Sequence, residues 1–456
     1  MENGDVIDLF IDRPSKKEKL DSIYAGKIRN KDESLQAIFM DIGLSKPGFL
    51  PMNQIPPNLR EKYPLTEGSY LPVQIIKEPY QDKGPRLTAN IALSNSALVY
   101  QPFGQDIRSS KRLGDEKVQQ WQTFFKRELA PSEGVIVRSE ASSYTEEEMR
   151  AMLDPLRQQW SELMVKINQV KRPSLLYERP LVPDQMMNRY ANYGIDRYTF
   201  DNYTDFKRIQ RQYPTLNHLM EQKKTPYQIA GMSVDGWLSK LTDKTIAKKN
   251  GISLTIDITE ALTVIDVDTN TFKTNQVKDI AVFQANQKAI ITAVQEIRRR
   301  NLSGIILIDF LKMKREKERA IIIQQMKDLL REDPVQTKIY GFTRLGLLEM
   351  TRKRERATLQ ALMKDEQSVL FYRLERELYE YNKRSSVEAI LLKMQPDLYE
   401  EWKEKWLTEL EKWNTLSVYC MTDDAVNKLE IFRVGSEELV HDWIQEHPNV
   451  IVDKVL

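Results

Sequence analysis

Two short apolar segments that end in aspartate most constrain how this chain can fold. Residues 262–268 read Leu-Thr-Val-Ile-Asp-Val-Asp, and residues 304–309 read Gly-Ile-Ile-Leu-Ile-Asp. Their β-branched composition is typical of buried strands. Residues 277–301, between them, carry apolar side chains at helical spacing and predict a helix. A strand, a helix and a second strand form a βαβ unit, in which the two strands run parallel.

The aspartates of this unit predict a metal site. Asp266 and Asp309 end the two strands, and the carboxyl ends of parallel strands meet at one edge of a sheet. Asp268 lies two residues past Asp266 and therefore on the same face of its strand. Carboxylates that converge in this way suit Mg²⁺, which could orient a water and stabilise charge on a scissile phosphate. The alternative is that each aspartate only caps the following helix or turn.

Composition excludes several other kinds of site. The single cysteine, Cys420, rules out internal disulfides and a cysteine-built zinc site within one chain. The three histidines are scattered, which disfavours a histidine metal site or a histidine-based triad. No apolar run approaches the roughly 20 residues of a membrane span, and the first residues lack the pattern of a signal peptide. We therefore expect a cytoplasmic protein without a membrane partner.

Basic residues are clustered although the net charge is only +2. Three runs stand out, at residues 298–300, 312–319 and 352–356. Such runs are usually solvated helix faces, and that is the default interpretation. Because two of these runs closely follow the elements that carry the aspartates, they could instead contact a phosphate backbone.

The remaining segments predict further elements. Short strands with glycine-rich turns between residues 23 and 77 favour a small β-barrel of OB type. Phe39 and Phe49 fall on its strands, either as barrel core, which their spacing favours, or as a platform for bases, each stack contributing roughly 1–3 kcal/mol. Residues 5–14 predict one more strand, and residues 146–170 predict a helix whose capping box involves Thr145 and Glu148. The last hundred residues predict helices to about Trp413, then two strands and a helix.

Six blocks of sequence, taken in order, resemble the ribonuclease E/G family. They are Leu-Phe-Ile-Asp-Arg-Pro (9–14) with Ile-Tyr-Ala-Gly-Lys-Ile (23–28), Gln-Ala-Ile-Phe-Met-Asp-Ile-Gly-Leu (36–44) with Gly-Phe-Leu-Pro (48–51), Gly-Val-Ile-Val-Arg-Ser (134–139), Thr-Glu-Ala-Leu-Thr-Val-Ile-Asp-Val-Asp (259–268), Asn-Leu-Ser-Gly-Ile-Ile-Leu-Ile-Asp-Phe-Leu-Lys-Met (301–313) and Phe-Thr-Arg-Leu-Gly-Leu-Leu-Glu-Met-Thr-Arg-Lys-Arg (342–354). Each block is weak by itself, but six in the family's order are a specific signal. In size the chain is closest to the ribonuclease G branch.

The resemblance implies a multidomain α/β fold. A deoxyribonuclease-I-like catalytic domain would stand on an RNase H-like scaffold that is interrupted by an OB-fold barrel and a 5′-sensor. The implied ranges are 1–19 and 173–250 for the scaffold, 20–95 for the OB-fold RNA-binding domain, 96–172 for the 5′-sensor region, 251–360 for the catalytic domain and 361–456 for a small C-terminal domain.

The resemblance also implies a function and its residues. The chain would be a Mg²⁺-dependent endoribonuclease that cuts single-stranded RNA and prefers a 5′-monophosphate. Asp266 and Asp309 would hold the metal, with Asp268 beside them, and Arg344 would contact the scissile region. The other implied residues are Arg138 and Ser139 at the 5′-phosphate, and Phe39, Phe49 and Lys83 on the RNA.

Departures from the family pattern keep other hypotheses open. Lys288 stands where the family has an acid, and Asp268 stands where it has an asparagine. The paired cysteines of the family's zinc link are absent, so any homodimer would form without that link. The first hypothesis is an active endoribonuclease in ribosomal RNA processing or messenger RNA decay. The second is an RNA-binding, ribosome-associated protein with weakened or lost catalysis, and the third is a phosphodiesterase that acts on DNA or nucleotides.

Overall fold

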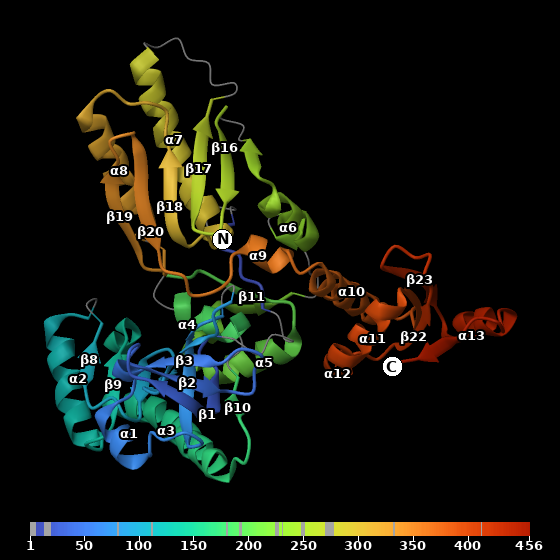
Figure 1. Ribbon diagram of the computed structural model, residues 1–456, viewed down its shortest axis with the longest axis horizontal. Helices are drawn as coiled ribbons and strands as arrows, with labels where there is room; N and C mark the ends of the chain where they lie inside the picture. The colour runs from blue at the N-terminus through green and yellow to red at the C-terminus, as the bar shows by residue number, and fades with distance from the viewer. Residues whose placement is uncertain are drawn as a thin grey trace. The chain divides into compact units, whose positions relative to one another are not determined.

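The chain folds into two compact units. The structure is a computed structural model that describes residues 6–12, 20–79, 82–110, 113–178, 181–190, 194–223, 228–229, 231–247, 251–269, 278–331, 333–411 and 413–456. By internal contacts the described residues up to Leu359 form the first unit, and residues from Gln360 to Leu456 form the second (Figure 1). No helix in these ranges is both long enough and apolar enough to cross a membrane.

The first part of the larger unit is a closed β-barrel, as the sequence predicts. Its strands are β1 (Ile23–Asp32), β2 (Ala37–Asp41), β3 (Gly48–Pro51), β4 (Tyr70–Lys77) and β5 (Arg86–Thr88), with α1 (Pro57–Lys62) between β3 and β4. They follow the order β1-β2-β3-β5-β4, and β1 pairs with β4 to close the barrel. The short strand β10 (Ser174–Tyr177) adds to β1 from outside. Aliphatic side chains such as Ile38, Leu50 and Val73 fill the interior.

A second, four-stranded sheet follows the barrel. Its order is β6-β7-β9-β8, formed by β6 (Leu93–Ser94), β7 (Leu98–Gln101), β8 (Ile107–Ser109) and β9 (Gly134–Val137). Two helices, α2 (Asp115–Glu128) and α3 (Glu146–Gln169), share one apolar core with this sheet. The predicted capping box is present, because Thr145 and Glu148 exchange hydrogen bonds at the start of α3.

Short elements connect this region to the largest sheet. They are α4 (Met186–Tyr190), β11 (Tyr198–Phe200), α5 (Tyr203–Gln212), β12 (Met220–Gln222), β13 (Gln228–Ile229), β14 (Met232–Ser233) and α6 (Val234–Thr242). β11 and β12 pair in parallel, and β13 and β14 form a small hairpin.

The largest sheet contains the predicted βαβ unit. Its order is β15-β16-β17-β18-β20-β19, formed by β15 (Thr245–Ala247), β16 (Ser253–Ile258), β17 (Leu262–Asp268), β18 (Gly304–Asp309), β19 (Thr337–Phe342) and β20 (Leu347–Arg352). β17 and β18 are parallel neighbours, joined through α7 (Lys278–Arg299). α7 and α8 (Glu316–Leu330) share one apolar core with the sheet and cover one of its faces (Figure 1).

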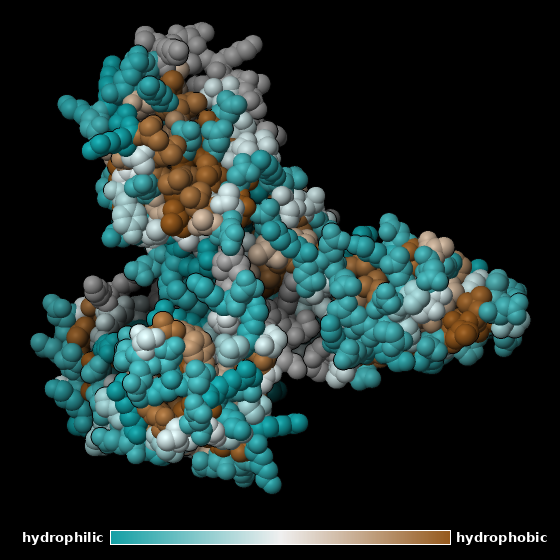
Figure 2. Space-filling view, in the orientation of Figure 1, coloured by the Kyte–Doolittle hydropathy of each residue, from teal (hydrophilic) through white to brown (hydrophobic). Residues whose placement is uncertain are grey.

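Among the residues that the structure describes, no helix covers the other face of this sheet (Figure 1). Burial alternates along β17 and β18: Ile265 and Ile308 are buried toward the helices, whereas Asp266 and Asp309 are exposed on the open face. Ile305 is 49% exposed on the same open face. Figure 2 shows an apolar patch at the surface over β17 and β18. The two aspartates therefore lie at the end of an open, partly apolar surface.

The predicted strand over residues 5–14 is wrong in the part that the structure describes. Residues 6–12 belong to no strand. Side-chain contacts hold them instead: Asp8 accepts hydrogen bonds from Arg298 and Tyr190, and Phe10 packs edge-on against Tyr190.

The second unit is a small α/β domain. Its helices are α10 (Glu366–Asn382), α11 (Pro396–Lys405), α12 (Leu407–Leu410) and α13 (Glu437–Glu446), and α9 (Leu359–Met363) precedes them. The sheet order is β23-β21-β22-β24, formed by β21 (Ala389–Met394), β22 (Ser417–Thr422), β23 (Leu429–Gly435) and β24 (Val452–Lys454). An apolar core lies on each face of this sheet. The prediction of helices alone up to Trp413 is wrong, because β21 is a central strand.

Candidate active site

The sheet brings Asp266 and Asp309 together. They are directly paired residues in the parallel register of β17 and β18. Hydrogen-bonded strands lie about 4.8 Å apart, so the two carboxylates project side by side from adjacent strands. Both side chains are exposed, and neither forms an ion pair with a protein cation in the described ranges. This edge of the sheet therefore presents two neighbouring carboxylates to solvent.

Asp268 does not complete a three-carboxylate cluster. Its Oδ1 accepts a hydrogen bond of 2.7 Å from the amide of Thr269, and its backbone partner on β16 is Ser253. Among the residues that the structure describes, no three acidic, histidine or cysteine side chains are grouped closely enough to hold a metal ion. The role of Asp268 as a third metal ligand stays a prediction.

Asn286 fixes the chain just beyond Asp309. Its side chain is fully buried on α7. The Nδ2 group donates to the carbonyl oxygen of Leu311 at 2.8 Å, and the amide of Leu311 donates to Oδ1 at 3.0 Å. This reciprocal pair ties the helix to the segment two residues after Asp309. The signal in the sequence that could have revealed this role is an asparagine between Ala285 and Ala289, on the apolar face of the helix.

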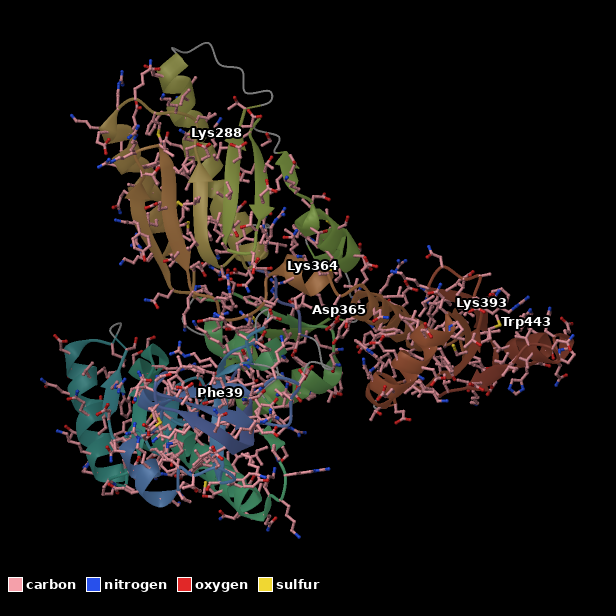
Figure 3. The ribbon with its side chains drawn as sticks, in the orientation of Figure 1. Phe39, Lys288, Lys364, Asp365, Lys393 and Trp443 are labelled. Atoms are coloured by element: carbon pink, nitrogen blue, oxygen red, sulfur yellow. The ribbon has the colours of Figure 1, made fainter. Side chains whose placement is uncertain are left out.

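Lys288 lies on a different face of α7. It is exposed and follows Asn286 by two residues, a separation at which helical side chains do not face each other (Figure 3). Because Asn286 points toward the end of β18, Lys288 points away from it. The replacement of an acid by Lys288 therefore does not support the hypothesis that catalysis is weakened or lost.

Basic residues flank the carboxylate edge. Arg344 lies in the turn between β19 and β20, and Leu347, which starts β20, is paired with Asp309. Thr343 fixes this turn: its amide donates to the Leu347 carbonyl at 2.8 Å, and its Oγ1 accepts from the Leu347 amide at 3.1 Å. Lys312 follows Asp309 by three residues, and both Arg344 and Lys312 are exposed. Two cations are thus available near the aspartate pair.

The basic run 298–300 is not a solvent-exposed helix face, and its side chains are too buried to contact a phosphate backbone. Arg298, Arg299 and Arg300 are only 9%, 3% and 5% exposed. Arg298 pairs with Asp8 at 2.5 Å, and Arg300 pairs with Glu296 at 2.9 Å. Arg299 also pairs with Glu296 and donates to a backbone carbonyl near the chain start. The default interpretation of this run as a solvated face is therefore wrong, because these arginines form buried ion pairs with Asp8 and with Glu296 of α7.

Part of the run 352–356 is buried in the same way. Arg352 is 3% exposed and pairs with Asp333 at 2.6 Å. Arg356 is 8% exposed and lies over the ring of Phe10. Lys353, between them, remains exposed.

The predicted RNA-binding residues of the barrel lie on its outer surface. Phe39 and Phe49 are paired across β2 and β3, with ring centroids 5.7 Å apart in an edge-to-face arrangement (Figure 3). Both are partly exposed, and neither belongs to the barrel core. Lys83 is exposed in the loop before β5, where a Cβ on the next residue, Gly84, would come 1.9 Å from the Pro47 carbonyl. The core interpretation of the two phenylalanines was therefore wrong.

Arg138 and Ser139 lie at the end of β9, in the second sheet. Both are half-buried, and the amide of Arg138 donates to the carbonyl of Ala97 at 2.8 Å. Nearby, burial raises the pKa of Tyr100, which also donates to Glu133 at 2.6 Å. The role of Arg138 and Ser139 at a 5′-phosphate stays a prediction.

Comparison with known proteins identifies the family. A sequence model of the ribonuclease E/G family matches residues 92–355. Ribonuclease G of Haemophilus influenzae is 28% identical over 389 residues, which cover 80% of this chain and 79% of the relative. Ribonuclease G of Escherichia coli is 27% identical with the same coverage, and ribonuclease E of a Nostoc species is 26% identical over 76% of this chain and 53% of its own length. The matched range includes the aspartate pair, Asn286 and Arg344, and the chain belongs to the ribonuclease E/G family.

Proposed function

We propose that the protein is an endoribonuclease that hydrolyses single-stranded RNA in RNA processing or decay. The observation that carries this proposal is the in-register pair Asp266 and Asp309 on the open face of the sheet of a ribonuclease E/G family member. In this proposal the sheet from β15 to β20 with α7 and α8 is the deoxyribonuclease-I-like catalytic domain. The short elements from α4 to α6 belong to the RNase H-like scaffold.

The aspartate pair fits Mg²⁺. This ion needs one or two carboxylates and keeps several of its waters, so two neighbouring oxygen donors suffice without a third acid. When bound, Mg²⁺ would supply an activated water and stabilise negative charge on the phosphate. Asp266 and Asp309 would hold it, and Asp268, two residues past Asp266 on the same exposed face of β17, would orient a water ligand.

The protein's own groups would then position the RNA. Asn286 holds the backbone after Asp309 through two hydrogen bonds, which keeps that carboxylate in place. Arg344 and Lys312 are exposed near the same edge, where a guanidinium and an ammonium can bind the non-bridging oxygens of a phosphate. Fixed positive charge at that point stabilises the extra negative charge that develops during cleavage.

The remaining assignments follow from the family. Phe39 and Phe49 would stack on bases of the single strand, with Lys83 on its phosphates. Arg138 and Ser139 would bind a 5′-monophosphate, whose oxygens suit a guanidinium fork and a hydroxyl. We propose a cytoplasmic location for such an enzyme. A homodimer remains compatible with the chain, without a cysteine zinc link.

The test compares cleavage by the wild-type protein and by Asp309→Asn. The substrate is 5′-monophosphorylated single-stranded RNA with Mg²⁺, beside DNA of the same sequence. We expect the variant to lose about 100-fold or more in rate, since several kcal/mol of charge stabilisation is removed and each 1.4 kcal/mol is tenfold.

Asp257→Asn is the matched control. Asp257 is an exposed aspartate on β16 that is paired with Val264 rather than with Asp266 or Asp309, and it forms an ion pair with Lys244. This control should cleave at the wild-type rate. Equal rates for wild type and Asp309→Asn, or no RNA cleavage by either, would overturn the proposal. Faster cleavage of DNA than of RNA would identify DNA as the substrate.

A further inference from the structure

A strip of apolar side chains leads up to the aspartate pair on the open face of the largest sheet. Three directly paired couples of β17 and β18 form it in order: Leu262 with Ile305, Val264 with Leu307, and Asp266 with Asp309. Alternate residues of a strand point to the same face, so all three couples lie on the open face. The four apolar members are partly or largely exposed, and we name them the apolar floor. The patch visible in Figure 2 therefore ends at the two carboxylates.

Glu349 borders the apolar floor on its β20 side. It is directly paired with Leu307, so its side chain points to the same open face. The side chain is exposed, and it forms no ion pair or hydrogen bond with any residue that the structure describes. The carboxylate of Glu349 is therefore available to a ligand that lies on the floor.

Glu349 is placed to bind something other than the metal. It is a diagonal neighbour of Asp309, and such neighbours lie about 7–8 Å apart across a sheet. In the ranges that the structure describes, no three acidic, histidine or cysteine side chains are close enough to hold one ion. A carboxylate also repels the phosphate groups of RNA. The partner that suits Glu349 is a group that presents N–H donors.

The opposite border of the floor differs from this one. Asp257 is directly paired with Val264, on the β16 side. Its carboxylate is held by Lys244, whose Nζ lies 2.7 Å from Oδ1. Glu349, rather than Asp257, is therefore the carboxylate that a ligand on the floor can engage.

The cations near the aspartate pair determine which part of an RNA reaches the floor. Lys312 and Arg344 lie beyond Asp309, at the ends of the strands, and would hold the backbone there. The floor lies in the opposite direction, because Leu307 precedes Asp309 by two residues, or about 6.6 Å. A nucleotide whose phosphate lies at the aspartates can thus place its base over the floor. The ring would cover aliphatic side chains, and its edge would face Glu349.

We propose that the apolar floor and Glu349 form a nucleobase subsite that selects guanine beside the scissile phosphate. Guanine presents two parallel donors on its pairing edge, N1–H and the N2 amino group, which match the two oxygens of a carboxylate. Uracil presents carbonyl oxygens on both sides of N3–H, and a carboxylate repels them. Adenine and cytosine present one amino donor beside an acceptor nitrogen. This edge is free in single-stranded RNA and occupied in a duplex. The inference rests on the proposed function for its substrate.

Cleavage of matched RNA oligomers tests the subsite. The reference is an unstructured, uridine-rich 5′-monophosphorylated RNA with a single guanine, which is moved along the chain one position at a time. Matched oligomers carry inosine, which lacks the N2 amino group, or uridine in its place. In wild type the guanine RNA should be cleaved with a kcat/KM about 5- to 150-fold above that of the uridine RNA, the range of one bidentate contact. The cut should stay at a fixed distance from the guanine, and inosine should fall between the two.

Glu349→Gln is the decisive variant, and Asp257→Asn is its matched control. Glu349→Gln should bring the ratio of guanine to uridine rates close to one, whereas Asp257→Asn should keep the wild-type ratio. A structural role of Glu349 would slow the cleavage of every RNA equally and leave the ratio unchanged. If Glu349→Gln does not fold, the comparison of guanine with inosine in wild type decides instead.

Three results would overturn the proposal. They are equal rates for the guanine, inosine and uridine RNAs in wild type, an unchanged ratio in Glu349→Gln, and a floor that is covered by a second copy of the chain. The last would appear in sedimentation as a dimer that Leu307→Ser converts to a monomer, with the ratio unchanged.

Binding measured in EDTA separates this proposal from the proposed function. If wild type cleaves all the RNAs at equal rates, the guanine subsite fails and the endoribonuclease stands. If wild type cleaves none of them, the endoribonuclease fails, and affinities for short guanine and uridine oligomers decide the subsite. A preference for guanine that Glu349→Gln abolishes would support it, and equal affinities would overturn it.

Discussion

Removal of the Asn286 side chain should loosen the segment that follows Asp309. In Asn286→Ala the amide and the carbonyl of Leu311 lose their partners, at 3.0 and 2.8 Å. Asn286 is fully buried, so water cannot easily replace it. Each buried group left unpaired costs about 1–3 kcal/mol, and two such groups cost about 2–4 kcal/mol together when they relax partly.

Hydrogen exchange read by mass spectrometry measures this cost locally. At about 1.4 kcal/mol per tenfold, a loss of 2–4 kcal/mol predicts that the amide of Leu311 exchanges roughly 30 to several hundred times faster. RNA cleavage should slow with it, mainly in kcat, because the carboxylate is held less firmly. Gln287→Ala, at the next position of α7, is the control and should leave both readouts unchanged. Unchanged exchange at Leu311 in Asn286→Ala would refute the reasoning.

Three further predictions use other parts of the larger unit. Arg298→Met should lower the free energy of unfolding of the larger unit by about 3–5 kcal/mol, because the buried Asp8 carboxylate loses the cation with which it is paired. Thermal unfolding measures this loss. Although burial alone would raise it, hydrogen bonds from Arg157 and Tyr100 hold the pKa of Glu133 below its usual 4.5. Glu133 therefore contributes stability above pH 4.5 that is lost as pH falls, and Glu133→Gln should flatten the acid side of the stability profile. Phe39→Ala should weaken RNA binding by about 1–3 kcal/mol with little change in melting temperature. A lower melting temperature with unchanged RNA binding would show instead that Phe39 is a core residue.

The βαβ unit of the largest sheet was predictable because its pattern is local. Apolar, β-branched runs ending in Asp266 and Asp309, with a helical period between them, determine a βαβ unit, and the parallel register then pairs the two residues. The exposure of both aspartates also follows, since alternate residues of a strand point to opposite faces.

Tertiary partners explain what the sequence did not reveal. The run 298–300 looks like a charged helix end, and only the fold supplies Asp8 as the buried partner of Arg298, whereas Glu296 lies one turn earlier on the same helix. The strand β21 reads Ala-Ile-Leu-Leu-Lys-Met, and most of these residues also favour helices. Its conformation is determined by two neighbouring strands, β22 in parallel and β23 in antiparallel pairing. Phe39 and Phe49 look like core on spacing alone, because alternation shows two faces without showing which one is buried.

Binding of Mn²⁺, which carboxylates accept in place of Mg²⁺, tests the central claim most directly. Calorimetric titration would compare wild type with Asp266→Asn, Asp309→Asn and the control Asp257→Asn. We expect one site in wild type and in the control, and its loss in each of the other two variants. Undiminished binding in both Asp266→Asn and Asp309→Asn would contradict the assignment of this pair as the metal ligands.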